Sequence, residues 1–215
     1  MNRKLLILES NWGENEEEYL TDSRSTSKIY SSIETLLSLH NSPLQIIQRP
    51  LLSFRFVEDI KQFTNLPENK NGVNIIILSA HGSLVRKKKN SLKTKKITRT
   101  LCAIDNVINI STEMRKVSKF LKRTIIILDS CAIGEKTESF LKASKALGVI
   151  GFSKDVDWID SAVFILALLC KYQDEGAFSL KRFTPVKPKQ IIAQMEVGHY
   201  KLFFDELGIE YCFVK

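Results

Sequence analysis

A histidine and a cysteine each follow directly on an isoleucine-rich apolar run. One run leads into Ser79-Ala80-His81-Gly82 and the other into Asp129-Ser130-Cys131. An imidazole beside a thiol suits nucleophilic acyl transfer, because the base can take the thiol proton as the sulfur attacks a carbonyl. If both runs are central strands of one sheet, we expect His81 and Cys131 to emerge at the same edge. Backbone amides near Gly82 and Gly134 would then be available to an oxyanion.

The rest of the chain alternates predicted strands and helices. The strands are expected at 5–8, 44–48, 73–78, 124–128, 148–152 and 209–214, and the helices at 29–37, 54–63, 112–121, 138–147, 158–172 and 191–207. Tyr30 is a candidate for the apolar face of the first helix, Thr112 is a candidate N-cap, and the proline-containing segment 174–189 is expected to be a loop. Such alternation indicates a mostly parallel sheet covered on both faces. We therefore expect one domain over residues 1–215, a three-layer α/β/α sandwich with about six strands. Its functional residues should lie at the carboxyl ends of the strands.

The net charge of +8 comes from one short segment. Eight basic residues and no acid lie between residues 83 and 99, and the remainder of the chain balances 24 basic against 24 acidic residues. Apolar and threonine residues spaced among the lysines predict a basic β-hairpin insertion at about 83–104, directly after His81. The segment has no aromatic side chain to stack on bases, so a nucleic-acid partner is disfavoured.

Several other classes of protein and site are disfavoured by the sequence. The basic start is followed by only four apolar residues, and the longest apolar stretch, 162–170, is far below the roughly 20 residues that cross a bilayer. The four cysteines have no paired short spacing, so we expect reduced thiols in a cytoplasmic protein with no membrane partner. No metal-ligand spacing or phosphate loop is recognisable, so neither a metal nor a cofactor is expected.

The strand-end motifs, with Val149-Ile150-Gly151-Phe152-Ser153 as a weaker third, resemble those of the caspase-like cysteine peptidases. This group contains caspases, metacaspases and the bacterial CHAT proteases. In caspases the histidine lies about 50 residues before the cysteine, which is the separation of His81 and Cys131. The resemblance implies that His81 is the base or thiolate partner and that Cys131 is the nucleophile of an acyl-enzyme. The oxyanion would rest on the backbone amides of Gly82 and Cys131, and no third catalytic residue is needed.

The resemblance also bears on the substrate pocket. Metacaspase-like proteins carry a pocket acid two residues before the nucleophile, where this chain has Asp129, and this implies cleavage after Arg or Lys. The alternative role of Asp129 is local, as an acid that accepts amide hydrogen bonds ahead of a helix. Asp155 and Asp157 are candidates for a second pocket acid, although Asp157 also fits the N-cap of the next helix. Trp158 is either a pocket wall or a core aromatic.

Only sixteen residues, 132–147, separate Cys131 from the next predicted strand. This leaves no long cleavable linker, so we expect an uncut chain that a ligand, a partner protein or the ordering of a loop activates. The need for calcium, which some metacaspases use, stays open. The sequence favours a cysteine endopeptidase acting on proteins or peptides, in a bacterial defence or regulatory role. Two alternatives remain: a non-catalytic nucleic-acid-binding module that uses the hairpin, and a caspase-fold scaffold with a vestigial dyad.

Overall fold

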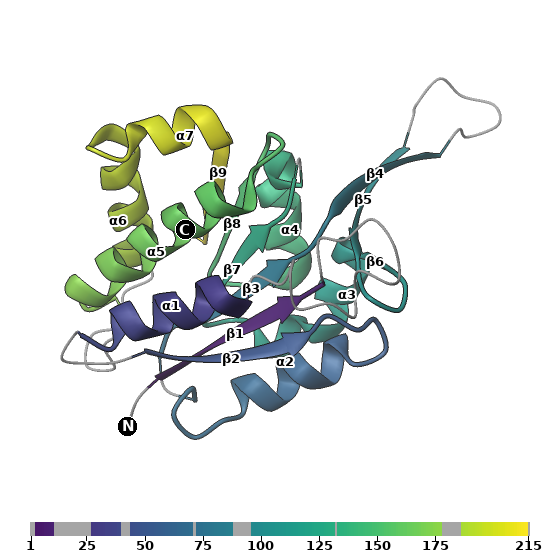
Figure 1. The fold of residues 1–215 in the computed structure, drawn as a ribbon. Helices are drawn as coiled ribbons and strands as arrows, with labels where there is room; N and C mark the ends of the chain where they lie inside the picture. Colours follow the sequence, from purple (N-terminus) through teal and green to yellow (C-terminus); the bar gives the residue numbers. More distant parts are fainter. Residues whose placement is uncertain are drawn as a thin grey trace.

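The protein is built on a six-stranded sheet (Figure 1). The structure, a computed structural model, describes residues 3–10, 27–39, 44–70, 72–87, 96–131, 133–177 and 186–214. The strands lie in the order β2 (Leu44–Pro50), β1 (Arg3–Glu9), β3 (Asn74–Ser79), β7 (Thr124–Asp129), β8 (Gly148–Phe152) and β9 (Ile209–Phe213). All neighbours are parallel except β8 and β9, which are antiparallel. The predicted mostly parallel sheet of about six strands is confirmed.

The two central strands, β3 and β7, explain their isoleucine-rich sequences. Every residue of both strands is buried. A strand covered on both faces needs apolar side chains on both, so its sequence is a continuous run rather than an alternation. The two strands pair in register from Asn74 opposite Thr124 to Ser79 opposite Asp129. They therefore end level with one another.

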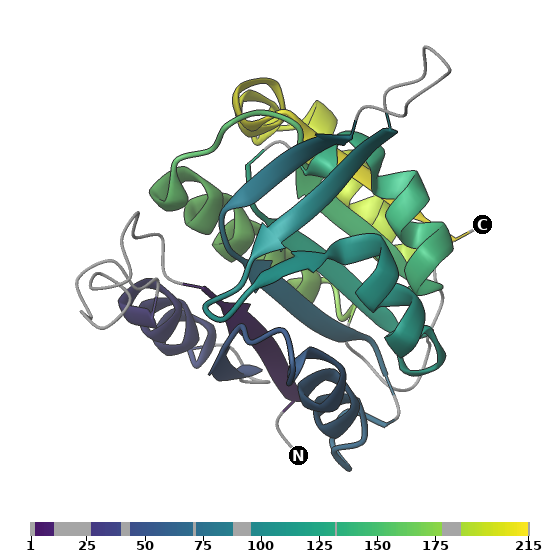
Figure 2. The ribbon, with the colours of Figure 1, turned by 90° about the vertical axis from the view of Figure 1, so that its right-hand side faces the viewer.

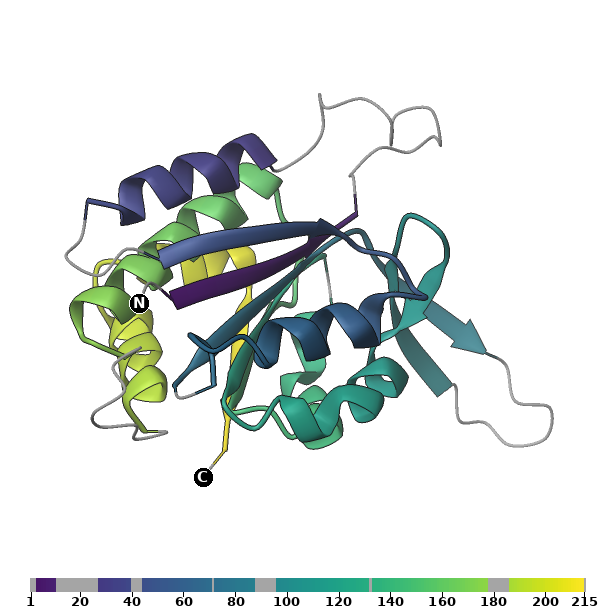
Figure 3. The same ribbon diagram turned by 90° about the horizontal axis from the view of Figure 1, so that it is seen from below.

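Helices cover both faces of the sheet, which gives the expected three layers (Figures 1 and 3). One face packs against α1 (Ser27–Leu37), α5 (Trp158–Asp174), α6 (Val186–Val197) and α7 (Lys201–Leu207). The other packs against α2 (Phe56–Thr64), α3 (Ile110–Val117) and α4 (Thr137–Ser144). Each face has its own apolar cluster, with the sheet between them. In the described part of the chain, no helix has the length and apolar character needed to cross a membrane.

Two helices differ from the sequence prediction. The helix expected at 191–207 is two helices, α6 and α7, joined by a turn at residues 198–200. Helix α6 starts at Val186, inside a segment that its prolines suggested was a loop. Pro188 lies in the first turn of α6, where the missing N–H breaks no helical hydrogen bond. In α3 the N-cap is Asn109 rather than Thr112, and the Asn109 side chain accepts a hydrogen bond from the Thr112 amide at 3.1 Å.

The basic segment forms part of a second, antiparallel sheet. Its strands are β4 (Gly82–Lys87), β5 (Lys96–Cys102) and β6 (Val107–Asn109), in that order. Strands β4 and β5 extend away from the main sheet as a twisted ribbon (Figures 1 and 2). The predicted hairpin is confirmed in these two strands, and β6 adds a third. Residues 88–95 of the predicted hairpin lie outside the described residues.

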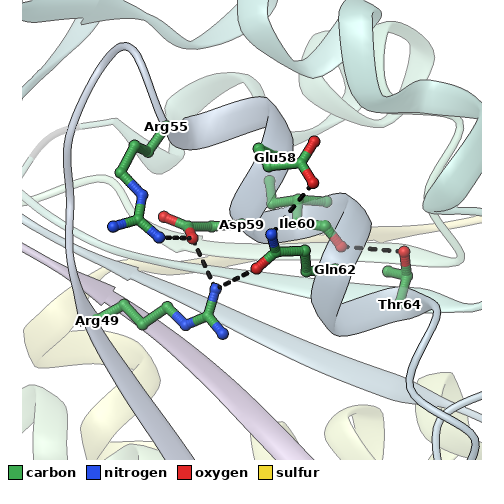
Figure 4. A network of polar contacts seen from close by, with 7 residues as sticks. All are labelled: Arg49, Arg55, Glu58, Asp59, Ile60, Gln62 and Thr64. Atoms are coloured by element: carbon green, nitrogen blue, oxygen red, sulfur yellow. Dashed lines mark hydrogen bonds and ion pairs between the residues drawn. The ribbon is translucent and has the colours of Figure 1, made fainter.

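A polar network fixes the end of β2 to α2 (Figure 4). Asp59 is buried, and its carboxylate accepts hydrogen bonds from Arg49 at 2.7 Å and from Arg55 at 3.3 Å. Arg49 also donates to Gln62 at 3.1 Å. A buried carboxylate is tolerated when cationic donors satisfy it. The network therefore has a structural explanation in the packing of α2 against the sheet.

Candidate active site

The ends of β3 and β7 remain linked beyond the last strand residues. The Ala80 amide donates to the Asp129 carbonyl at 3.2 Å, and the Ser130 hydroxyl donates to the Ala80 carbonyl at 2.5 Å. His81 and Cys131 are the next residues of the two segments. Neighbouring strands lie about 4.8 Å apart. The structure thus places the two predicted catalytic residues on adjacent strand ends at one edge of the sheet.

Gly82 brings the two motifs into direct contact. A Cβ atom added at Gly82 would lie 2.4 Å from the carbonyl oxygen of Cys131 and 2.7 Å from the side chain of Ile133. These distances are too short for any side chain, so only glycine allows the backbone after His81 to lie against the backbone of Cys131. The backbones of the histidine and cysteine motifs therefore lie against each other at this edge of the sheet.

The pairing of β4 with β5 determines where the Gly82 amide points. The Cys102 amide donates to the His81 carbonyl at 2.9 Å, and Gly82 lies opposite Leu101. In an antiparallel ladder this makes Gly82 and Leu101 a non-hydrogen-bonded pair. The N–H of Gly82 consequently points away from β5. This direction suits the predicted role of that amide as an oxyanion donor.

The Cys131 thiol lies against the segment between β8 and α5. Its Sγ donates to the Val156 carbonyl at 3.7 Å and accepts from the Val156 amide at 3.5 Å. Burial raises the pKa of the half-buried Cys131 thiol, the charges of Asp155 and Asp129 raise it further, and the Val156 amide opposes the shift. These surroundings therefore favour the protonated thiol over the thiolate. Attack on a carbonyl requires a base to remove that proton.

Asp129 lies two residues before Cys131 and is held by hydroxyl groups. Its side chain is buried, and Oδ2 accepts hydrogen bonds from Ser79 at 2.8 Å and from Tyr30 at 3.1 Å. Burial raises the pKa of Asp129, whereas the hydroxyls of Ser161, Ser79 and Tyr30 lower it and the charge of Glu9 raises it. The Oδ1 atom is also buried and accepts no hydrogen bond of good geometry from the described groups, although the Ser161 hydroxyl lies close enough to the carboxylate to lower its pKa.

Tyr30 is the residue of this site that the sequence prediction missed. Its position on the apolar face of a predicted helix assigned it to the core, and its ring is indeed buried. A buried tyrosine hydroxyl nonetheless needs a hydrogen-bond partner. That requirement could have indicated that Tyr30 bonds to a polar group at the strand ends, because these ends carry polar residues such as Ser79 and Asp129.

The remaining predicted pocket residues have distinct environments. Asp155 is exposed and near enough to the thiol for its charge to raise the Cys131 pKa. Asp157 accepts a hydrogen bond from the Ile159 amide at 2.7 Å and is the N-cap of α5, as its capping interpretation requires. Trp158 is 39% exposed, so it is not a core aromatic. Among the residues that the structure describes, no three His, Cys, Asp or Glu side chains gather as metal ligands would.

Trp158 lines an apolar groove between α1 and α5, which lie side by side (Figure 1). The groove has a volume of about 400 Å³. It is lined by Lys28, Ile29, Ser32, Ile33, Leu36, Trp158, Ile159, Ala162, Val163 and Leu166. Its end at Trp158 is two residues beyond Val156, whose backbone contacts the nucleophile. Trp158 is therefore a groove residue that lies close in sequence to the segment contacting the thiol.

The segment after the nucleophile is fixed from two sides. A Cβ atom at Gly134 would lie 2.4 Å from the Phe152 amide nitrogen, so this glycine packs the segment against β8. This contact with β8 accounts for a glycine at this position. On the other side, the buried Arg99 of β5 pairs with Glu135 at 2.5 Å. The base of the basic hairpin is thus tied to the nucleophile segment.

No protein-family model matches the sequence, and no curated protein matches it either. Among solved structures, the chain is similar to a secreted C11 cysteine protease from Bacteroides thetaiotaomicron in complex with an irreversible peptide inhibitor. The TM-score is 0.55 at 11% identity, over 96% of this chain and 59% of that one. The fold is that of a caspase-like C11 cysteine protease. This confirms the predicted architecture, while membership of the caspase, metacaspase or CHAT group stays a prediction.

Two further structures are more distant. A second secreted C11 protease structure from B. thetaiotaomicron, "iotapain", has a TM-score of 0.47 at 14% identity, over 73% of this chain and 54% of that one. Protein GSU0716 from Geobacter sulfurreducens has a TM-score of 0.43 at 10% identity, over 99% of this chain and 92% of that one. The chain spans just over half the length of the C11 proteases that it matches.

Proposed function

We propose that this chain is a cysteine endopeptidase whose catalytic residues are His81 and Cys131. The observation that carries the proposal is the contact between Gly82 and the Cys131 carbonyl, where a Cβ atom would lie only 2.4 Å away. The residue after the histidine therefore lies against Cys131, on a fold shared with a C11 cysteine protease. That protease binds a peptide inhibitor, which favours peptides as the substrates here too.

The proposed reaction begins with the protonated thiol. His81 takes the proton as Cys131 Sγ attacks the scissile carbonyl, and the oxyanion accepts hydrogen bonds from the Gly82 and Cys131 amides. The C–N bond then breaks, and the amine leaves with the proton from His81. Water attacks the resulting thioester with His81 again as base. This step releases the acid and restores the thiol.

Asp129 is proposed as the acid that receives a basic substrate side chain. One observation favours this role over a purely local one. The Asp129 carboxylate is held by side-chain hydroxyls rather than by amides of a following helix. Asp155 is a second acid near the thiol, and Trp158 is a candidate wall for the substrate. Asp157 already caps α5 and has less freedom to serve in a pocket.

The remaining features of the proposal concern the whole chain. Residues 1–215 are taken as one peptidase domain that works uncut, and a ligand, a partner or loop ordering would activate it. A defence or regulatory role and a cytoplasmic location remain predictions from the sequence, and the Bacteroides protease with this fold is a secreted protein. The hairpin after His81 is a candidate docking element for an activating partner.

A fluorogenic peptide panel tests this function. Peptides ending in Lys, Arg, Asp, Leu or Ala before the reporter are incubated with wild type, Cys131→Ala, His81→Ala and Cys170→Ala. Cys170 is another half-buried free cysteine and serves as the matched control. We expect cleavage of basic peptides by wild type and Cys170→Ala, with a loss of about 10³-fold or more in the other two variants.

Two outcomes would contradict the proposal. One is a folded wild type that cleaves no peptide and whose Cys131 no peptide-based electrophile labels. The other is cleavage that survives Cys131→Ala. Salt-dependent binding of RNA or DNA to an inactive wild type would instead support the nucleic-acid-binding alternative.

A further inference from the structure

The base of the basic hairpin contacts both halves of the proposed site. Strand β5 reaches the histidine segment through its backbone, because the Cys102 amide donates to the His81 carbonyl at 2.9 Å. The same strand reaches the nucleophile segment through a side chain, because Arg99 pairs with Glu135 at 2.5 Å. Arg99 and Cys102 both belong to β5. A shift of this strand therefore acts on His81 and on the segment after Cys131 together.

The two ends of the ion pair differ in their environment. The Arg99 side chain is 5% exposed, whereas the Glu135 side chain is 51% exposed. The Arg99 Nε atom is buried and has no hydrogen-bond acceptor among the described residues. A buried charge that is incompletely satisfied costs free energy, and apolar residues of similar volume often replace a buried ion pair with no loss of stability. Stability alone therefore does not explain an arginine at this position.

Glu135 lies close to the nucleophile along a tightly packed stretch of chain. It belongs to the short helix η4 (Gly134–Lys136), which begins three residues after Cys131. Gly82 lies against the Cys131 carbonyl, and Gly134 lies against β8. Both are close contacts of the backbone, and they leave little space for the segment to absorb a movement of Glu135. The position of the carboxylate is thus coupled to that of the nucleophile.

We propose that Arg99 is a positioning residue for the peptidase, and that its ion pair with Glu135 holds Cys131 in the geometry that attack on the substrate requires. The inference rests on the proposed function and deepens it. Arg99 does not touch the substrate in this scheme, and acts through the backbone between Glu135 and Cys131. Because Arg99 belongs to the hairpin, an event that moves β5 changes turnover through the same pair.

The test measures kcat and KM separately, with the peptide that wild type cleaves best. The variants are Arg99→Met, Arg99→Lys and Glu138→Gln. Arg99→Met keeps a long side chain without its charge and leaves the Glu135 carboxylate half-exposed to water. Glu138→Gln is the matched control, because Glu138 lies three residues after Glu135 and pairs with Lys142 of its own helix, α4, at 2.9 Å.

The expected results separate positioning from a purely structural role. In Arg99→Met, kcat should fall about 10²-fold while KM stays within about twofold of wild type, since a misplacement of about 1 Å has an effect of this size on rate. Urea denaturation should find this variant as stable as wild type, because no buried charge is left unpaired. Arg99→Lys should keep kcat within about tenfold of wild type, since an ammonium can also make a single contact with Glu135. Glu138→Gln should match wild type in kcat and KM.

Glu135→Gln tests the pair from its other side. It leaves the buried Arg99 without a counter-charge, so both kcat and stability should fall. In the double variant Arg99→Met/Glu135→Gln, kcat should be no lower than in Arg99→Met, because two residues that act through one contact have non-additive effects. If Glu135→Gln fails to fold, the double variant still tests the pair, since it contains no unpaired buried charge.

The outcomes distinguish this inference from the proposed function. A folded Arg99→Met whose kcat stays within about twofold of wild type overturns the inference and leaves the peptidase intact. The same holds if KM alone changes, if stability falls together with kcat in Arg99→Met, if the losses add in the double variant, or if Glu138→Gln loses as much activity. Absence of any Cys131-dependent cleavage in wild type overturns the proposed function, and the inference with it.

Discussion

A single methyl group at Gly82 should separate the two halves of the active site. The Cβ atom of Gly82→Ala would lie 2.4 Å from the Cys131 carbonyl oxygen. Restoring an ordinary contact of about 3.4 Å requires a displacement of about 1 Å. Because the obstructing atom belongs to the backbone, the nucleophile segment itself must move. A misplacement of about 1 Å costs on the order of 10²-fold in rate, and the overpacking should lower the free energy of unfolding by about 1–3 kcal/mol.

Gly148→Ala is the control for the overpacking alone. Its Cβ atom would also lie 2.4 Å from a neighbour, but that neighbour is the Phe213 ring, at the end of β8 opposite the site. We expect Gly148→Ala to lose stability in urea denaturation while kcat/KM for a basic peptide stays within about twofold of wild type. Gly82→Ala should lose both. Full activity in Gly82→Ala, or an equal loss of activity in Gly148→Ala, would refute the reasoning.

Two further predictions concern the groups next to the nucleophile. Asp129→Asn should lower kcat/KM for basic peptides by about 10²-fold or more, because the substrate cation loses its counter-charge. Burial raises the pKa of Asp129 above its value in the unfolded chain. The folded state therefore holds this proton more tightly, and the free energy of unfolding falls as the pH rises from about 4. In urea denaturation, the free energy of unfolding of Asp129→Asn relative to wild type should therefore increase as the pH rises from 4 to 7. If the variant is instead much less stable than wild type at pH 7, the carboxylate has a structural role. Burial raises the pKa of the Cys131 thiol, so little of it is thiolate at pH 7. Alkylation of Cys131 by iodoacetamide, followed by mass spectrometry, should keep accelerating beyond pH 9, and a plateau reached at pH 7 would contradict the shift.

The sequence predicts the central sheet well because burial on both faces leaves a strong pattern. Runs such as Ile75-Ile76-Ile77-Leu78 have few alternatives to a covered parallel strand. The same pattern predicts that His81 and Cys131 emerge together, since both follow central strands. The contact of Gly82 with Cys131 is a consequence of this register.

Other features could not be predicted because they depend on contacts between distant segments. The hydrogen bond from Tyr30 to Asp129 joins residues 99 positions apart, and nothing local marks either as the partner of the other. The early start of α6 was missed because prolines suggest loops, yet Pro188 occupies a first-turn position that tolerates it. Asn109 replaced Thr112 as the cap of α3 because the preceding β6 ends directly at the helix.

The long-range contacts of Cys131 also determine when a newly made chain can become reactive. The surroundings of Cys131 come from distant parts of the chain. Tyr30 donates a hydrogen bond to Asp129, Gly82 lies against the Cys131 carbonyl, and the Val156 backbone binds the sulfur. Contacts of such wide sequence separation form late in folding, because a large loop must close before they are made. A nascent chain from which His81 and Cys131, but not yet Val156, have emerged from the ribosome therefore lacks the complete surroundings of Cys131. Under the proposed function, synthesis itself would delay proteolysis until the chain through Val156 has left the ribosome.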